Sequence, residues 1–137
     1  MLLDSNILVY ALNIRSPKNQ AAQKFLQENL KELVVAHQNI LETLRVLTHS
    51  KFPHPLSAQK AIEEITTITD ACKIIYPNNN THYLALELIR EHKLVGNYIF
   101  DAYLMATAMS NNIMTIATDN IKDFQKFKIQ LINPFIK

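Results

Sequence analysis

The sequence is poor in cysteine, in net charge and in long hydrophobic runs. Its only cysteine, Cys72, has no partner for a disulfide bond within the chain, and no CxxC or Cys/His cluster offers a zinc site. The apolar run at residues 7–12 is far too short to cross a bilayer, and no basic segment of a signal peptide precedes it. We therefore expect a cytoplasmic protein in a reducing environment, with neither export nor membrane insertion.

Charge and composition exclude few functions. The chain has 14 Lys and Arg residues against 12 Asp and Glu, and the resulting charge of +2 is only weak evidence for nucleic-acid binding. Its 137 residues are 48% hydrophobic and 19% charged, which is ordinary for a folded globular protein and too apolar for a disordered one. No repeat, low-complexity tract or linker divides the sequence, so we expect one domain over residues 1–137.

Apolar segments of strand length alternate along the chain with segments of helical periodicity. Because helices separate successive strands, we expect an α/β fold in which the strands run parallel. The predicted strands are residues 1–3, 33–36, 72–76, 113–117 and 129–132. The predicted helices are residues 7–12, 16–30, 38–50, 57–71 and one beginning at Thr81, followed by the apolar segment 98–109 and a short helical turn near Asp123.

Local patterns refine two features of these helices. Ser16, which precedes a proline, and Thr81, which follows a run of asparagines, are expected to cap helices. Glu42 points away from the apolar face of the helix at 38–50, so its position alone predicts exposure to solvent. That face is predicted to consist of Ile40, Leu41, Leu44, Leu47 and Thr48.

Several acidic residues stand where acids are unusual. Asp4 is the only charge within residues 1–12 and follows the first predicted strand, where open α/β sheets place their ligand sites. Asp101 is the only charge within residues 98–109, on a helical face that is otherwise apolar. Asp119 follows another predicted strand, and Asp123 comes four residues later. We expect these carboxylates to gather at one edge of the sheet.

A gathering of carboxylates predicts a metal ion. A buried, unpaired carboxylate costs several kcal/mol, so Asp101 needs a base, a proton or a metal ion, and its segment contains no Lys or Arg. Several carboxylates also repel one another, and a divalent cation is the usual way to keep them ionised together. Ligation by oxygen alone suits Mg²⁺ or Mn²⁺, ions that activate water for phosphodiester cleavage. The pattern therefore predicts a metal-dependent nuclease.

Each of these residues also has a purely structural interpretation. Asp4 fits an N-cap of the following helix, and Asp101 fits a first-turn acid favoured by the helix dipole. Asp119 and Asp123, taken singly, fit helix caps or solvated acids in turns. The prediction of a metal site therefore depends on the positions of all these acids taken together. The histidines show no metal-ligand spacing and are expected at the surface, least securely the first, which directly follows a strand. They are His37, His49, His54, His82 and His92.

Four short segments occur in order along the chain: LLDSN at 2–6, NILE at 39–42, FDAYLMATA at 100–108 and TDNIKDF at 118–124. In that order they resemble the PIN-domain ribonucleases, in particular the VapC toxins of prokaryotic toxin–antitoxin pairs. The resemblance covers essentially the whole chain. It implies a three-layer α/β/α fold with a central parallel sheet.

The resemblance also implies roles for individual residues. Asp4 and Asp101 become the central metal ligands, and Glu42 joins the acidic pocket, which replaces the expectation of a merely exposed side chain. Asn6 is expected to support the site. The hydroxyl of Thr118 is expected to orient a ligand or a water.

The last acid of the site stays open at this point. In the family it commonly stands two residues after the strand-end Thr, and here that position is Asn120. Asp119 and Asp123 are the remaining candidates, with Asp123 completing a metal set of Asp4 and Asp101.

The activity implied by the resemblance is Mg²⁺-dependent endoribonuclease activity, with Mn²⁺ as a substitute for Mg²⁺. A metal-activated water would attack a phosphorus of single-stranded RNA, and nearby Lys and Arg residues would position phosphates without reading sequence. The family further implies a homodimer and a small antitoxin protein that covers the site.

Three alternatives compete with this interpretation. A phospho-receiver domain needs an adjacent acid pair after the first strand and a lysine after the last, and neither occurs here. A phosphatase with an aspartyl nucleophile needs DxDxT, but Asn6 stands at the second acidic position. The closest alternative is a PIN-like module that binds RNA or a protein and has a metal site weakened at Asn120.

Overall fold

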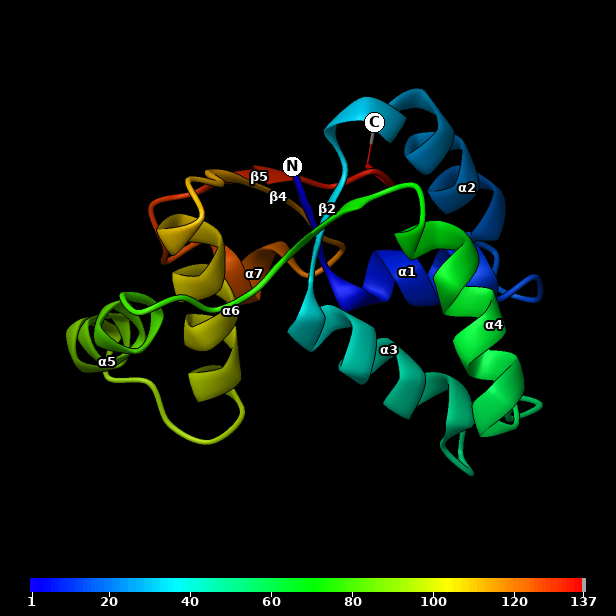
Figure 1. The fold of residues 1–137 in the computed structure, drawn as a ribbon, viewed down its shortest axis with the longest axis horizontal. Coiled ribbons are helices and arrows are strands. Elements are labelled where there is room, and N and C mark those ends of the chain that lie inside the picture. Colours follow the sequence, from blue (N-terminus) through cyan, green and yellow to red (C-terminus); the bar gives the residue numbers. More distant parts are fainter. Residues whose placement is uncertain (137) are drawn as a thin grey trace.

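The computed structural model describes residues 1–136, in which five parallel strands form one sheet between two groups of helices (Figure 1). The strand order is β3-β2-β1-β4-β5. The chain therefore builds outward from β1 to β3 and then crosses to the other side of β1, so the order reverses between β1 and β4. The strands are β1 (Leu2–Leu3), β2 (Val34–Ala36), β3 (Lys73–Ile75), β4 (Thr115–Ala117) and β5 (Gln130–Ile132).

The helices cover both faces of this sheet. In Figure 1 the helices α1 to α4 lie on one side of the sheet and α5 to α7 on the other. The predicted α/β/α fold with a central parallel sheet is thus confirmed. None of the helices within residues 1–136 has the length and apolarity needed to cross a membrane. They are α1 (Ser5–Leu12), α2 (Asn19–Glu28), α3 (His37–Thr48), α4 (Ala58–Thr69), α5 (Thr81–His92), α6 (Tyr98–Ser110) and α7 (Ile121–Phe124), with a 3₁₀ turn at Leu30–Glu32.

Alternating strand residues build the two hydrophobic cores. Successive side chains of a strand point to opposite faces, and a parallel sheet covered by helices buries both. Leu2 and Val34 pack into the core on the α5 and α6 side. Leu3 and Val35 pack into the core beneath α1, α2 and α4. The sheet is therefore buried on both faces, and its strand ends are the place where polar groups can reach solvent.

The buried face of α3 differs from the predicted one. Leu41 is 63% exposed, whereas Asn39 and Thr43 are fully buried beside Leu47. The side-chain oxygens of both residues are hydrogen-bonded: Asn39 Oδ1 accepts from the N–H of Ala36 at 3.2 Å, and Thr43 Oγ1 donates to Asn39 O at 2.7 Å. The buried Nδ2 of Asn39 has no partner among the described residues. The prediction from the spacing of apolar residues was wrong for this face, because two polar residues occupy part of it.

The two predicted helix caps are also displaced. Ser16 lies in the turn before α2, where its Oγ accepts from the N–H of Lys18 at 3.1 Å, and the helix begins at Asn19. Thr81 is the first residue of α5, and its Oγ1 accepts from the N–H of Asn78 at 2.8 Å. Both hydroxyls stabilise the turn that leads into the helix, which is the other common use of these side chains.

Asn39→Ala should lower the free energy of unfolding by about 1–3 kcal/mol, because the N–H of Ala36 loses its buried acceptor. Urea unfolding measures this loss. The matched control is Thr48→Ala, an exposed position on the same helix, which should change stability by less than about 0.5 kcal/mol. Equal effects of the two substitutions would show that the hydrogen bond of Asn39 does not stabilise the start of α3.

Candidate active site

Asp4 lies where the sheet changes its strand order. It follows β1, and its N–H donates to Ala117 O at the end of β4 at 2.9 Å. The side chain is only 7% exposed. Its Oδ1 accepts from the N–H of Ser5 at 2.8 Å, so Asp4 is also the N-cap of α1. The capping interpretation and the site interpretation therefore apply to the same carboxylate.

The other oxygen of Asp4 is held by two neutral side chains. Thr118 Oγ1 donates to Asp4 Oδ2 at 2.7 Å, and Asn6 Nδ2 donates to the same oxygen at 3.2 Å. Thr118 Oγ1 in turn accepts from the N–H of Asn120 at 2.9 Å. Strand β4 and helix α1 together fix the orientation of this carboxylate.

Glu42 joins Asp4 through the first turn of α1. Ser5 Oγ donates to Glu42 Oε2 at 3.1 Å and lies 3.5 Å from Asp4 Oδ1. Gln38, one turn earlier on α3, donates from Nε2 to Glu42 Oε1 at 3.0 Å. Glu42 is half-buried rather than free in solvent, so its position on the helix alone predicted its environment incorrectly.

Asp101 lies in the first turn of α6 and faces the same region. Its carboxylate makes no hydrogen bond and no salt bridge to the rest of residues 1–136. Partial burial, together with repulsion from Asp123, Asp4 and Glu42, raises its pKa to about 6, although the charge of Lys126 acts in the opposite direction. Burial, and to a smaller degree the charge of Glu42, also raises the pKa of Asp4 to about 6, against the hydrogen bonds that lower it. The structure thus brings four predicted acids into one electrostatic group.

Asp123 and Asn120 lie at the edge of this group. Asn120 precedes α7, and its Nδ2 donates a hydrogen bond to Asp123 Oδ2. Among the neighbouring acids, Asp123 contributes the largest repulsion on Asp101. The amide at position 120 therefore acts as a donor to an acid and does not add a carboxylate of its own.

Asp119 is separated from the other acids. Its Oδ2 accepts a charged hydrogen bond from Lys18 Nζ and another from Tyr10 Oη at 3.1 Å, and Asn133 Nδ2 lies 3.4 Å from its Oδ1. Although partial burial raises the pKa of Asp119, the hydrogen bonds from Lys18 and Tyr10 lower it below its usual value. Only its backbone N–H reaches toward the site, donating to Asn6 Oδ1 at 3.3 Å.

The acids open onto a groove of about 680 Å³ between α3 and α6. Glu42 and Asp101 both line it, as does His37, which packs against the ring of Tyr76 at 5.8 Å between centroids. The lining residues are His37, Gln38, Leu41, Glu42 and Arg45 from α3, with Asn97, Phe100, Asp101 and Tyr103 from α6 and its N-cap.

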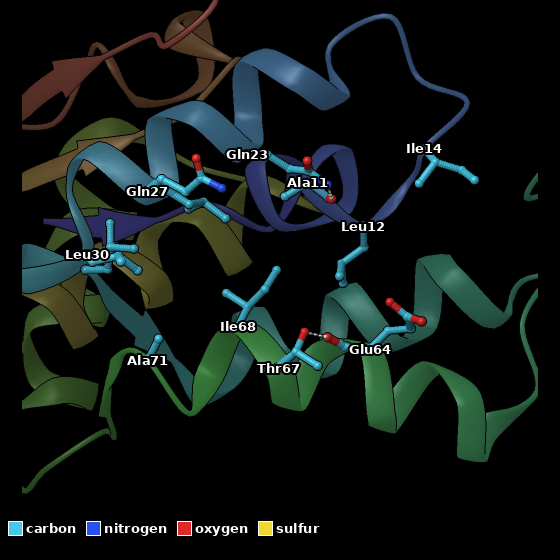
Figure 2. Close-up of a pocket in the computed structure, with 12 residues that line it drawn as sticks. Ala11, Leu12, Ile14, Gln23, Gln27, Leu30, Glu64, Thr67, Ile68 and Ala71 are labelled. Atoms are coloured by element: carbon cyan, nitrogen blue, oxygen red, sulfur yellow. Dashed lines mark hydrogen bonds between the residues drawn. The ribbon is translucent and has the colours of Figure 1, made fainter.

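A second groove, of about 380 Å³, lies between α1, α2 and α4 (Figure 2). Figure 2 shows Leu12 and Ile68 pointing into it from opposite sides. None of the predicted site acids lines this groove, so it is a separate surface. Its lining is mostly aliphatic: Ala11, Leu12, Ile14, Leu26, Leu30, Leu33, Ile68 and Ala71, with Gln23, Gln27, Glu64 and Thr67.

The carboxylates of the acidic group are suitable ligands for a divalent cation, but they do not form a complete coordination site by themselves. Within residues 1–136, no group of three Asp, Glu, His or Cys side chains is arranged to hold a metal ion by itself. Mg²⁺ commonly keeps several waters and uses only one or two protein carboxylates. Asp4 and Asp101 offer such a pair, and no Lys or Arg of the described chain forms a salt bridge with either of them.

A family model for the PIN domain matches residues 1–129. The chain therefore belongs to the PIN-domain family, and this part of the sequence analysis is confirmed. None of the curated proteins matches the sequence.

Several solved structures with the same fold are VapC or VapBC proteins. VapBC2 from Rickettsia felis, bound to a DNA fragment from its promoter, has a TM-score of 0.75 and 22% identity over 96% of each chain. DNA-bound VapBC from Salmonella typhimurium has a TM-score of 0.73 and 14% identity over 97% of this chain and 96% of that one. VapC20 from Mycobacterium tuberculosis, a toxin that cleaves the sarcin-ricin loop, has a TM-score of 0.70 and 12% identity over 93% of this chain and 97% of that one.

Sequence analysis did not identify every residue that shapes the site. Gln38 was missed, although its spacing of four residues from Glu42 on a helix is a recognisable signal. Ser5 was part of a quoted segment but was given no role of its own. The pairing of Asp119 with Lys18 joins residues 101 positions apart, and no local pattern indicates it.

In the metal-free protein, Asp101→Asn should raise stability at pH 7.5 by about 1 kcal/mol, after allowance for solvent screening of a half-buried group. The pKa of Asp101 is raised to about 6, so folding favours its protonated form. That contribution is present below about pH 4, the unfolded-state pKa, and is lost as the pH rises through about 6. The stability difference between variant and wild type should therefore grow between pH 4 and pH 7.5, as measured by urea unfolding with a chelator.

The control is Asp70→Asn, an exposed acid at the end of α4 that lies outside the acidic group. It should show no such growth with pH. A destabilised Asp101→Asn protein at pH 7.5 without metal would contradict the electrostatic description of the site.

Proposed function

We propose that this PIN domain is a Mg²⁺-dependent endoribonuclease, with Mn²⁺ as a substitute metal. The observation that carries the proposal is the convergence of Asp4, Glu42 and Asp101 at one end of the sheet, where none of them forms a salt bridge with a Lys or Arg of residues 1–136. Asp4 and Asp101 would hold the metal, with Asp123 as the third contributor at the edge of the group. When bound, such an ion lowers the pKa of water and neutralises charge on a phosphate during hydrolysis.

The residues of the chain prepare this site in defined ways. Thr118 and Asn6 hold one oxygen of Asp4, so its other lone pairs keep a fixed direction. Ser5 and Gln38 fix Glu42, which provides an acceptor for a proton of the attacking water. Water adds to the phosphorus, the bond to the 3′ oxygen breaks and that oxygen takes up a proton from solvent, which leaves a 5′-phosphate and a 3′-hydroxyl.

The biological setting belongs to the same proposal. We propose that the whole chain, residues 1–137, is a single PIN domain, that it is cytoplasmic and forms a homodimer, and that it is the toxin of a toxin–antitoxin pair. Support comes from the structural neighbours, several of which are toxin–antitoxin complexes, including one from Klebsiella pneumoniae. The partner would then be a small antitoxin protein.

A second candidate function rests on Asn120. A neutral amide stands where the family commonly has an acid, and it hydrogen-bonds Asp123 instead of adding charge. This observation favours a binding module with a weakened metal site. Such a module would bind RNA or a protein but would not cut RNA.

Asp4→Asn should reduce Mg²⁺-dependent RNA cleavage by about 100-fold or more, because it removes a charge from the proposed metal site while keeping similar shape. Initial rates on a fluorescently labelled single-stranded RNA, with and without Mg²⁺ or Mn²⁺, measure this loss. Asp70→Asn serves as the control and should cleave at the wild-type rate. If wild type neither binds a divalent cation nor cleaves RNA, the binding-module function replaces the nuclease.

Asp123→Asn should reduce cleavage by about 10-fold or more, whereas Asp119→Asn should have a much smaller effect on rate. The reason is that Asp123 repels Asp101, while the carboxylate of Asp119 is occupied by Lys18. Asp119→Asn should instead lower the thermal midpoint, because Lys18 loses its partner. A reversed order of the two cleavage rates would place Asp119 in the metal site.

A further inference from the structure

The groove between α3 and α6 contains residues that the proposed chemistry does not use. Beside Glu42 and Asp101 it is lined by Phe100, Leu41 and Arg45. Phe100 is 60% exposed although it is one of the larger apolar side chains of the protein. An exposed aromatic ring and a cation that line the same groove as the acids fit a ligand with both a flat apolar face and a negative charge.

The position of Phe100 is tied directly to that of Glu42. Gln38 Nε2 donates to Glu42 Oε1 at 3.0 Å and to Phe100 O at 3.2 Å. One amide group therefore links α3 to α6 and fixes the backbone of Phe100 relative to the acid. Asp101 is the next residue on α6, so the ring and both acids belong to one framework.

Arg45 contributes a positive charge to this groove. It lies three residues after Glu42 on α3 and is exposed. Within the part of the chain that the structure describes, its guanidinium forms no salt bridge. An arginine that is not engaged by a carboxylate is available for a phosphate, to which its planar donor groups are well suited.

We propose that Phe100 and Arg45 form a nucleotide subsite for single-stranded RNA beside the acidic group. A base of the RNA stacks on the ring of Phe100, and a phosphate pairs with the guanidinium of Arg45. Every base has an apolar face, so this subsite holds the strand without selecting a sequence. The inference deepens the proposed function, since it assumes that RNA is the substrate of the same groove.

A matched pair of residues elsewhere provides the control. Tyr83 and Arg90 on α5 line a different groove, of about 340 Å³, which contains none of the proposed site acids. Tyr83 is 64% exposed, close to the value for Phe100. General attraction of RNA to an exposed aromatic and a cation would act equally at both places, so only a real subsite distinguishes them.

The chain has no tryptophan, which permits a direct test of stacking. Phe100→Trp and Tyr83→Trp each create a single fluorescent reporter, and both are combined with Asp4→Asn so that the RNA stays intact. A single-stranded RNA of about 12 nucleotides should quench the reporter at 100 saturably and about threefold more than the reporter at 83. A sugar–phosphate strand of the same length without bases should quench neither.

The second experiment tests the phosphate contact in the otherwise native enzyme. Arg45→Gln should raise KM for RNA about fivefold or more with little change in kcat, and it should reduce the slope of log affinity against log salt by about 0.7. Arg90→Gln should change neither quantity. Phe100→Ala should also raise KM, and Phe100→Tyr should restore it, because stacking needs an aromatic ring and a merely apolar role does not.

The outcomes separate this inference from the proposed function. Saturable quenching at position 100 without cleavage by wild type would overturn the nuclease and support the subsite. Cleavage by wild type with equal quenching at positions 100 and 83 would overturn the subsite and leave the nuclease. Emission at position 100 that responds to protein concentration but not to RNA would also overturn the subsite, since the groove would then be an interface between two copies of the chain.

Discussion

The organisation of this protein depends on one unfavourable interaction, the mutual repulsion of carboxylates held near one another at the carboxyl end of a buried sheet. Asp4 is nearly buried directly after β1, and α3 and α6 bring Glu42 and Asp101 toward it. Burial adds to the cost of this repulsion, and the pKa values of Asp4 and Asp101 are raised first by burial and then by the charges of neighbouring acids. The other residues of the site stabilise these carboxylates by hydrogen bonds and leave their negative charge in place.

Most of the hydrogen bonds that stabilise the acidic side chains come from neutral donors. Ser5, Asn6 and Thr118 donate hydrogen bonds to the acids, whereas Lys18 pairs with Asp119, and Lys126 acts on Asp101 through its charge without forming a salt bridge. A lysine bonded to Asp4 would stabilise the empty site, and it would also compete with any metal ion for the same oxygens. The fold therefore keeps its negative charge available while it satisfies the buried oxygens individually. Lys18, Tyr10 and Asp119 meanwhile tie the start of α2 to the end of β4, which supports the site from outside.

The two helices that carry the acids also shape the surface around them. Because α3 places Asn39 and Thr43 inside, Leu41 faces outward into the groove beside Arg45. The same rotation of the helix brings Glu42 toward α1 and the acidic group. The rotation of α3 about its axis thus determines both features. It buries a polar face of the helix, and it sets which α3 side chains line the groove.

The sequence by itself determined the order of strands and helices along the chain and the placement of Asp4 and Asp101 on elements that meet at one edge of the sheet. These features follow from local periodicity, which every short segment carries in its own residues. Only the tertiary structure decided that Glu42 accepts a hydrogen bond from Ser5, that Asp119 forms a salt bridge with Lys18 and that Leu41 faces solvent. Each of these outcomes is set by hydrogen-bond partners or packing partners from distant segments, and a local pattern contains no information about which distant group will be nearest.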